Sequence, residues 1–231
     1  MLFPLKFKHS EENKVFFFSD FHHNHDKDFI YQKRGFSSIQ EHNKILIERW
    51  NGKITDNDIV FHLGDLCFSK DAEQNMGILF GVLKFKNLYV MCGNHYSGYK
   101  QWFERVLNNL GYNNGIDKFY RLGHCVGDSN KTVFFIPNYY EVFVNNRPFV
   151  LCHYPVKVHN GYAQGSMMLF GHCHGSFIDG LPTTLDRGKM LDVGPESVKE
   201  PLSFSEIMEI MDKKQIIHES HHSEKTQNPF C

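Results

Sequence analysis

The stretch DNDIVFHLGD, residues 56–65, is a short apolar run that ends in Gly-Asp. An apolar run of this length, closed by a polar turn, is typical of a buried strand. The same arrangement occurs on either side of it, in KVFFFSD at residues 14–20 and in NLYVMCGNH at residues 87–95. The three stretches therefore predict strands whose carboxyl ends carry polar side chains.

Segments with helical spacing separate these strands. In residues 38–50 apolar side chains recur at helical intervals, Ser38 and Glu41 form a capping box at the start, and Asn51-Gly52 predicts the end. Two further segments are predicted as helices: residues 72–85 and 99–111. This alternation indicates a sheet covered by helices, and open sheets of that kind bind ligands at the carboxyl ends of their strands.

In the second half of the chain, strand-like runs replace the regular alternation of strands and helices. Residues 131–155 hold strand-like runs around the sequence NNRP at residues 145–148, which predicts a hairpin. Residues 167–174 and 189–194 predict two more strands, and residues 203–214 predict a final helix behind a second capping box. The pattern as a whole predicts one α/β or α+β domain.

The composition is that of an ordinary globular domain. Of the 231 residues 41% are hydrophobic and 22% are charged, so we expect one domain of residues 1–214, with residues 215–231 as a mobile tail. The formal net charge of −1 gives no electrostatic case for binding nucleic acid or an anionic membrane. No charged-then-apolar leader opens the chain, and no apolar run approaches the ~20 residues of a spanning helix. A soluble, cytoplasmic protein with no membrane partner is therefore expected.

Side chains that bind metals gather at the predicted strand ends. The stretch GHCHG, residues 171–175, by itself fits a metal site, a half-buried strand or a tolerant loop. In the whole chain, however, five separate segments carry candidate site residues: Asp20, His22, Asp65, Asn94, His95, His153, His172 and His174. Carboxylate, amide and imidazole groups suit Mn, Fe, Ni or Zn better than a thiolate set would. The set exceeds the four ligands of a structural zinc ion and fits two adjacent ions if one carboxylate bridges them.

The ordered series Asp-x-His, Gly-Asp, Gly-Asn-His, His and Gly-His-x-His resembles the calcineurin-like metallophosphoesterase superfamily. The resemblance extends from Phe16 to about Met211, and within the superfamily the chain is similar to a group of small phosphoesterases. It implies an α/β (α+β sandwich) fold in which central mixed β-sheets are flanked by helices in four layers within a single domain. It also implies two divalent metal ions, with Mn²⁺ as the first candidate and Fe, Ni and Zn as alternatives.

The resemblance assigns a role to each residue of the set. Asp20, His22, Asp65 and His174 would hold one metal, and Asp65, Asn94, His153 and His172 would hold the second, so that Asp65 bridges them. His95 would act beside the leaving oxygen as an acid or electrostatic donor. Relatives usually follow this histidine with Asp or Glu, whereas Tyr96 stands here. We therefore expect His95 to donate a proton more weakly than in relatives.

The roles of other polar residues near these motifs are less specific. His23 and His25 are expected to support the ligands or to face solvent, because the ligand set is already full, and His62 is expected in the core or behind the ligands. Arg34 and Arg187 are candidate phosphate clamps, since a guanidinium group matches the geometry of phosphate.

The expected activity is that of a metal-dependent phosphoric ester hydrolase. The resemblance implies attack of a metal-bound water or hydroxide on a phosphodiester, either a small diester or a nucleotide. A phosphomonoesterase or a nuclease with the same site is the alternative, and a non-catalytic scaffold of the same fold is a third reading. A nucleic-acid polymer is not favoured as a substrate because Lys and Arg are scattered. The sequence leaves the oligomeric state open.

Overall fold

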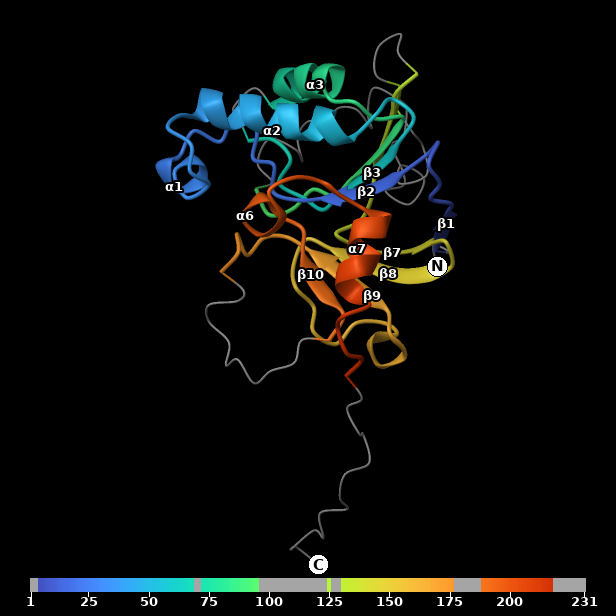
Figure 1. Ribbon diagram of the computed structural model, residues 1–231. Helices are drawn as coiled ribbons and strands as arrows, with labels where there is room; N and C mark the ends of the chain where they lie inside the picture. Colours follow the sequence, from blue (N-terminus) through green and yellow to red (C-terminus); the bar gives the residue numbers. More distant parts are fainter. Residues whose placement is uncertain (1–3, 69–71, 96–123, 126–129, 177–187, 218–231) are drawn as a thin grey trace, which may run out of the picture.

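The computed structural model describes residues 4–68, 72–95, 124–125, 130–176 and 188–217 (Figure 1). Its first sheet has six strands in the order β11-β2-β3-β4-β6-β5. β2, β3, β4 and β6 are parallel, and the edge strands β11 and β5 are antiparallel to their neighbours. The strands are β2 (Val15–Phe18), β3 (Ile59–His62), β4 (Asn87–Val90), β5 (His124–Cys125), β6 (Thr132–Phe135) and β11 (Leu202–Ser203).

The second sheet has five strands in the order β1-β7-β8-β9-β10. Only the β7–β8 pair is antiparallel, and it forms the predicted hairpin. Asn145 and Asn146 make its turn, with left-handed φ values of 47° and 61° that Asn tolerates well. The strands are β1 (Leu5–Phe7), β7 (Tyr139–Val144), β8 (Arg147–Cys152), β9 (Met167–Phe170) and β10 (Met190–Asp192).

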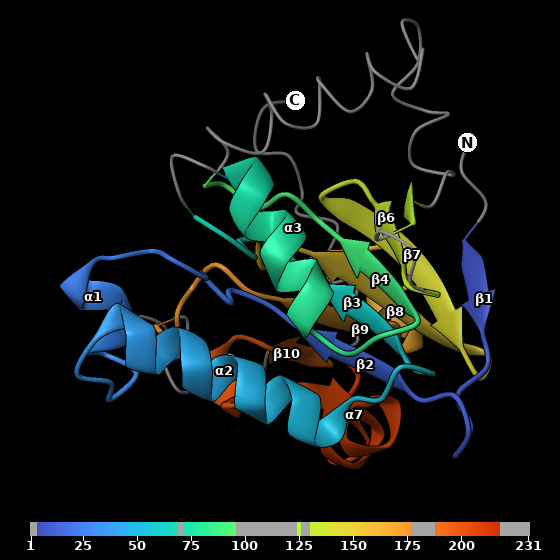
Figure 2. The same cartoon turned by 90° about the horizontal axis from the view of Figure 1, so that it is seen from above.

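Two long helices cover the outer face of the first sheet (Figures 1 and 2). They are α2 (Ile39–Lys53) and α3 (Ala72–Val82), and Trp50 of α2 packs with Phe18 of β2 in the core beneath them. A third helix, α7 (Phe204–Met211), lies beside β2 and β11. The remaining short elements are α1 (Asp28–Tyr31), α6 (Pro195–Val198) and the 3₁₀ turn η1 (Tyr162–Gln164).

One apolar core lies between the two sheets. Val15 and Phe17 of β2 point into it, whereas Phe16 and Phe18 point towards α2 and α3, so β2 is buried on both faces. Phe17 stacks on Phe61 of β3 and on Phe149 of β8, with ring centroids 5.4 Å apart in both pairs. These aromatic contacts join the sheets and fix the distance between their strand ends.

Most predicted elements form, but β9, α3 and α7 end three or four residues before their predicted ends, and β1, β5 and β11 were not predicted. The capping box of Ser203 and Glu206 is complete at the start of α7. At the start of α2 only one of the two hydrogen bonds of a capping box forms, from the backbone N–H of Glu41 to the Ser38 side chain. The Glu41 carboxylate accepts from the backbone of Ser37 and not from that of Ser38. The helix predicted at residues 99–111 lies outside the described residues.

The predicted end of α2 at Asn51-Gly52 is wrong by one or two residues, since the helix continues to Lys53. The physical reason is that the Asn51 side chain does not cap its own helix. It accepts a hydrogen bond from the backbone of Lys84 and donates one to the carbonyl of Val82.

The α/β fold with two mixed sheets and flanking helices in one domain is confirmed. Within the described ranges no helix is long and apolar enough to cross a bilayer. β2, β3 and β4 are parallel in one sheet, and β8 and β9 are parallel in the other. All five strands carry a predicted motif at their carboxyl ends, which brings the five motifs to one edge of the molecule.

Candidate metal centre

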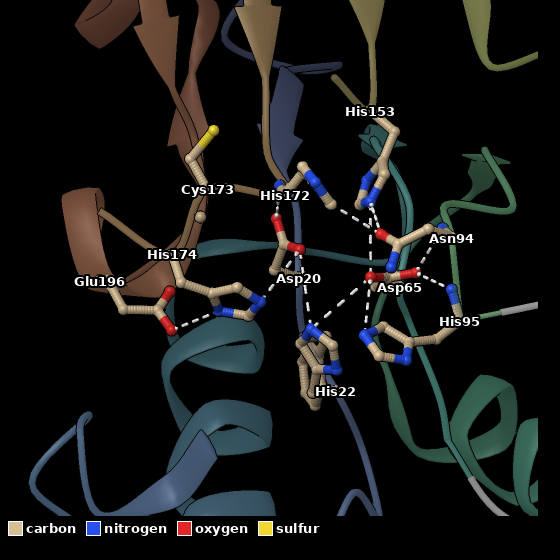
Figure 3. A network of polar contacts seen from close by, with 12 residues as sticks. Asp20, His22, Asp65, Asn94, His95, His153, His172, Cys173, His174 and Glu196 are labelled. Atoms are coloured by element: carbon tan, nitrogen blue, oxygen red, sulfur yellow. Dashed lines mark hydrogen bonds and ion pairs between the residues drawn. The ribbon is translucent and has the colours of Figure 1, made fainter. Parts of the chain in front are cut away.

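The five polar segments meet where these strands end (Figure 3). Asp20 follows β2, Asp65 follows β3, Asn94 follows β4, His153 follows β8, and His172 and His174 follow β9. The two sheets are tied together here by hydrogen bonds between their ends. The backbone N–H of His172 donates to Asp20 Oδ2 at 2.9 Å, and His153 Nδ1 lies 2.9 Å from the carbonyl oxygen of Leu63.

Each of the two aspartates uses one carboxylate oxygen to hold the backbone and leaves the other unbonded. Asp65 Oδ1 accepts from the N–H groups of Asn94 and His95, both at 3.0 Å. The other oxygens, Asp20 Oδ1 and Asp65 Oδ2, lie 3.7 and 3.8 Å from His22 Nε2. Among the described residues these three buried atoms have no hydrogen-bond partner. Such atoms cost roughly 1–3 kcal/mol each unless something binds them, so the arrangement fits a cation.

The remaining predicted ligands surround these atoms. His174 Nε2 is 3.9 Å from Asp20 Oδ1, and His153 Nε2 is 3.4 Å from Asp65 Oδ2. Asn94 Oδ1 lies 2.7 Å from His153 Nε2 and 2.8 Å from His172 Nδ1. The structure therefore brings all seven predicted ligands into one cluster. Three groups in it have donor atoms within 4.8 Å of one another: Asp20, His22 and His174; Asp20, Asp65 and His153; and His22, His25 and His95.

The backbone of this cluster is strained. Five of the seven predicted ligands have left-handed φ values between 47° and 68°, namely Asp20, His22, Asp65, His172 and His174. A residue other than glycine in this region costs on the order of 1 kcal/mol or more, and such residues concentrate at functional sites. At these positions the backbone turns sharply after a strand, and the turn directs each candidate ligand towards the centre of the cluster.

Two glycines permit the close approach of backbone to carboxylate. A Cβ atom at Gly93 would overlap Asp65 Oδ1, and one at Gly171 would overlap Asp20 Oδ2 and Ser19 Oγ. Gly93 also has a φ of 79°, which other residues rarely adopt. A side chain at either position would therefore displace a candidate ligand.

A carboxylate orients His174. The Nδ1 atom of His174 lies 2.7 Å from Glu196 Oε1, and the same oxygen accepts a 2.8 Å hydrogen bond from Arg34 Nε. Burial alone would raise the pKa of Glu196, but the hydrogen bond with His174 and the charge of Arg34 outweigh it and lower the pKa to about 2. Glu196 is therefore an anion that accepts a hydrogen bond from Nδ1–H of His174 and leaves Nε2 facing Asp20.

The structure corrects the predicted role of Arg34. Its side chain is only 2% exposed. Its guanidinium nitrogens are within hydrogen-bonding distance of Glu196, the carbonyl oxygens of Asp20 and Phe21, His42 and His174. Because Glu196, His42 and two carbonyl oxygens take up most of its donors, Arg34 supports the ligands from behind and is poorly placed to act as the predicted phosphate clamp. The other predicted clamp, Arg187, lies outside the described residues.

A second histidine supports His22. His25 is 3% exposed, and its Nδ1 lies 2.9 Å from Nδ1 of His22. Burial, assisted by neighbouring histidines, lowers the pKa of His25 to about 3, so the ring stays neutral and its Nδ1 can accept a hydrogen bond from Nδ1–H of His22. The ring also stacks on Phe68, with centroids 4.0 Å apart. Of the two expectations for His25, support of a ligand therefore holds and exposure to solvent does not.

The other histidines near the site differ in their surroundings. His23 is buried beside Phe21, so it does not face solvent. His62 is fully buried near Phe18 and Trp50, in the core as one of the two expectations had it. His95 stands on the open side of the cluster: its side chain is 32% exposed, and its Nε2 is 3.7 Å from Asp65 Oδ2.

Glu196 was not predicted as part of the site, and His25 was predicted as a support of the ligands or a solvent-facing residue, not as a ligand. The sequence has no motif that links Glu196 to His174, and His25 was set aside because the ligand set was already complete. Cys173 points away from the ligands in Figure 3 and packs against the apolar cluster on the outer face of the second sheet, which is made of Val150, Cys152, Met168, Phe170 and Met190. Tyr96 lies outside the described residues, so the expected weakness of His95 stays a prediction.

No protein-family model matches the chain. The chain is 26% identical over 205 residues to the uncharacterized protein MJ1445 of Methanocaldococcus jannaschii, an alignment that covers 88% of this chain and 94% of that protein. It is also similar to the crystal structure of AQ665, a protein of unknown function from Aquifex aeolicus, with a TM-score of 0.54 at 15% identity over 86% of this chain and 99% of that one. At that identity the second similarity shows the fold alone. The chain is thus similar to two proteins of unestablished function, and the argument for its own function rests on the cluster of Asp and His side chains.

Proposed function

We propose that this protein is a dinuclear-metal-dependent phosphoesterase that hydrolyses a small phosphodiester or nucleotide. The observation that carries the proposal is the set of three buried atoms without hydrogen-bond partners, Asp20 Oδ1, His22 Nε2 and Asp65 Oδ2, which face one another inside a ring of histidines. The ordered motifs that resemble metallophosphoesterases supply the same residues.

The residues present fit two divalent ions. Asp20, His22, Asp65 and His174 would hold the first, and Asp65, Asn94, His153 and His172 would hold the second. Oxygen and imidazole donors suit Mn, Fe, Ni and Zn, and the resemblance to metallophosphoesterases makes Mn²⁺ the first candidate. When bound, two such ions would neutralise phosphate charge and lower the pKa of a coordinated water.

The chain's own residues would then bind and orient the ester. The two carboxylates Asp20 and Asp65 bring less negative charge than two divalent ions would bring positive charge, so the loaded site would attract an anion. His95 stands beside Asp65 on the open side, where it could donate a proton or a hydrogen bond to the leaving oxygen. Its backbone N–H, held by Asp65 Oδ1, fixes the start of the imidazole side chain.

We favour catalysis over a non-catalytic scaffold because every position of the proposed ligand set carries a side chain that binds metals. A scaffold that had lost its ions would not need five strained backbone positions around buried carboxylates. A phosphomonoesterase or a nuclease with the same residues would be distinguished by its substrate.

The deciding experiment is hydrolysis of bis(p-nitrophenyl) phosphate by metal-stripped protein to which Mn²⁺ is added back. Asp65→Asn should reduce turnover by on the order of a thousandfold or more, because the bridging charge is lost. The matched control is Asp56→Asn, an exposed aspartate whose side chain is 66% accessible and which should behave as wild type. Faster turnover of p-nitrophenyl phosphate would make the protein a monoesterase. A folded protein inactive with Mn, Fe, Ni and Zn, or a fully active Asp65→Asn variant, would overturn the proposal.

A further inference from the structure

A cavity of about 420 Å³ lies beside the candidate metal centre, and His174 forms part of its wall. Its volume falls within the roughly 300–1,000 Å³ of small-molecule sites. Figure 3 shows His174 and Glu196 at the opposite end of the polar network from Asn94 and His95. The cavity is therefore reached from the His174 end of the cluster, away from His95.

The charged residues that line this cavity are mainly basic. Lys33, Arg34, Arg49 and Lys199 contribute positive charge, and among the described lining residues Glu196 is the single carboxylate. Glu196 is already paired with Arg34. In the part of the chain that the structure describes, Lys33, Arg49 and Lys199 have no carboxylate within 4.0 Å. Three uncompensated cations around one concavity attract an anion.

The protein backbone holds two of these cations at the cavity. Lys33 Nζ donates a 2.8 Å hydrogen bond to the carbonyl oxygen of His174. Arg49 Nη1 donates a 3.2 Å hydrogen bond to the carbonyl oxygen of Lys199, and its guanidinium lies 5.6 Å from the centre of the Phe36 ring. An ammonium group has three N–H donors and a guanidinium has five, so both residues keep donors for a phosphate.

We propose that this cavity binds a second phosphate group of the substrate. The inference rests on the proposed function, because the first phosphate is the ester held at the metal centre. His174 belongs to both places: its Nε2 faces Asp20, and the residue lines the cavity. A substrate with two phosphate groups would reach from one to the other across His174. The substrate class is then a nucleotide or small ester that carries a phosphate in addition to the one hydrolysed.

The first test measures binding without catalysis. Inorganic pyrophosphate is titrated calorimetrically into the full-length protein kept free of metal by a chelator. We expect Lys33→Gln and Arg49→Gln each to weaken binding about tenfold, the effect of one charge-assisted hydrogen bond. Lys33 is exposed, so its variant should fold normally even if Arg49→Gln does not.

The matched control is Lys44→Gln, which removes the same charge from an α2 lysine outside the cavity that is 73% exposed. It should bind pyrophosphate as wild type does. Three results would overturn the inference: no binding by wild type, unchanged binding by both Lys33→Gln and Arg49→Gln, or an equal loss in Lys44→Gln.

The second test uses two esters that differ by one phosphate. Thymidine 3′-(p-nitrophenyl phosphate) is compared with its 5′-phosphorylated form on the Mn²⁺-loaded protein. We expect the 5′-phosphate to lower KM about tenfold in wild type, and this advantage to disappear in Lys33→Gln. The absence of any advantage in wild type would overturn the assignment of the cavity to substrate.

The two tests also separate this inference from the proposed function. If pyrophosphate binds through Lys33 but no ester is hydrolysed with any metal, the proposed phosphoesterase activity fails while the anion site stands. If bis(p-nitrophenyl) phosphate is hydrolysed but pyrophosphate does not bind, the activity stands and the second phosphate site is wrong.

Discussion

The Nδ1 atom of His174 lies 2.7 Å from Oε1 of Glu196, a residue 22 positions further along the chain. The contact joins the connection after β9 to the start of α6, and Arg34 completes it from a third segment. It directs Nε2 of His174 towards Asp20. A histidine ligand held in this way by a carboxylate has one tautomer and a more basic free nitrogen.

Glu196→Gln should therefore weaken Mn²⁺ binding by about 10–100-fold, as loss of such a supporting carboxylate typically does. Gln keeps an oxygen for Arg34 but no longer provides the charge that draws the Nδ1 proton. The affinity can be measured by competition with a chelator. Glu209→Gln, at an exposed position of α7, is the control and should bind Mn²⁺ normally. Equal affinity in both variants would mean that Glu196 does not support a metal ligand.

His25→Phe should lower Mn²⁺ affinity about tenfold while the protein stays folded. The new ring can still stack on Phe68, but it cannot accept the hydrogen bond from Nδ1 of His22, which would lose its fixed orientation. His23→Phe makes the same exchange at the adjacent buried histidine. Equal Mn²⁺ affinity in His25→Phe and His23→Phe would mean that the contact between His22 and His25 contributes nothing to the site.

Asn94→Ala should remove the second metal ion preferentially. The Asn94 amide oxygen lies within hydrogen-bonding distance of both His153 and His172, so the substitution takes away one donor and loosens two others. Metal analysis after dialysis should give about one ion per chain for the variant, against two for wild type. Asn160→Ala, at an exposed asparagine bonded to Glu141, should keep both ions. Two tightly bound ions in Asn94→Ala would refute the assignment of this ligand.

The capping box of α7 should make stability depend on pH. Burial alone would raise the pKa of Glu206, but hydrogen bonds from Lys53 and from Ser203 outweigh it and lower the pKa. A lowered carboxyl pKa stabilises the folded state above the unfolded value of about 4.3, and this contribution is lost as pH falls through the folded value.

Glu206→Gln should consequently lower the free energy of unfolding at pH 7 by about 1 kcal/mol or less, because the side chain is 40% exposed and water screens its pair with Lys53. In urea titrations the difference from wild type should shrink towards zero near pH 3. Glu209→Gln on the same helix should show no such trend. A difference that persists unchanged at pH 3 would contradict the role of the charge.

Much of the frame of the site could be predicted because it is encoded locally. β2, β3 and β4 are apolar runs closed by Ser-Asp, Gly-Asp and Gly-Asn-His, and a pattern within ten residues is enough to indicate a strand and its polar end. Parallel strands then bring those ends together without further information. The left-handed conformations at Asp20 and Asp65 were not predicted, since they arise from the packing around each turn.

The partners of the ligands were not predictable in the same way. Arg34 carries the guanidinium group that a phosphate clamp needs. In the fold, however, this group donates hydrogen bonds to Glu196 and to backbone carbonyls. Burial decides between the two roles, and burial is a property of the assembled layers. For His25 the sequence left open support of a ligand or exposure to solvent, and its burial against Phe68 decides for support.

By itself, the sequence predicted strands β2, β3, β4, β8 and β9 and the order in which they deliver Asp, Asn and His side chains to one edge. The tertiary structure alone decided that Glu196 fixes His174, that His25 fixes His22, that Arg34 is internal, and that Lys33, Arg49 and Lys199 surround one cavity. The physical reason is the distance along the chain over which each kind of interaction acts. Secondary structure follows from hydrophobic periodicity and capping among near neighbours, whereas hydrogen-bond partners and local charge depend on segments more than a hundred residues apart being packed together.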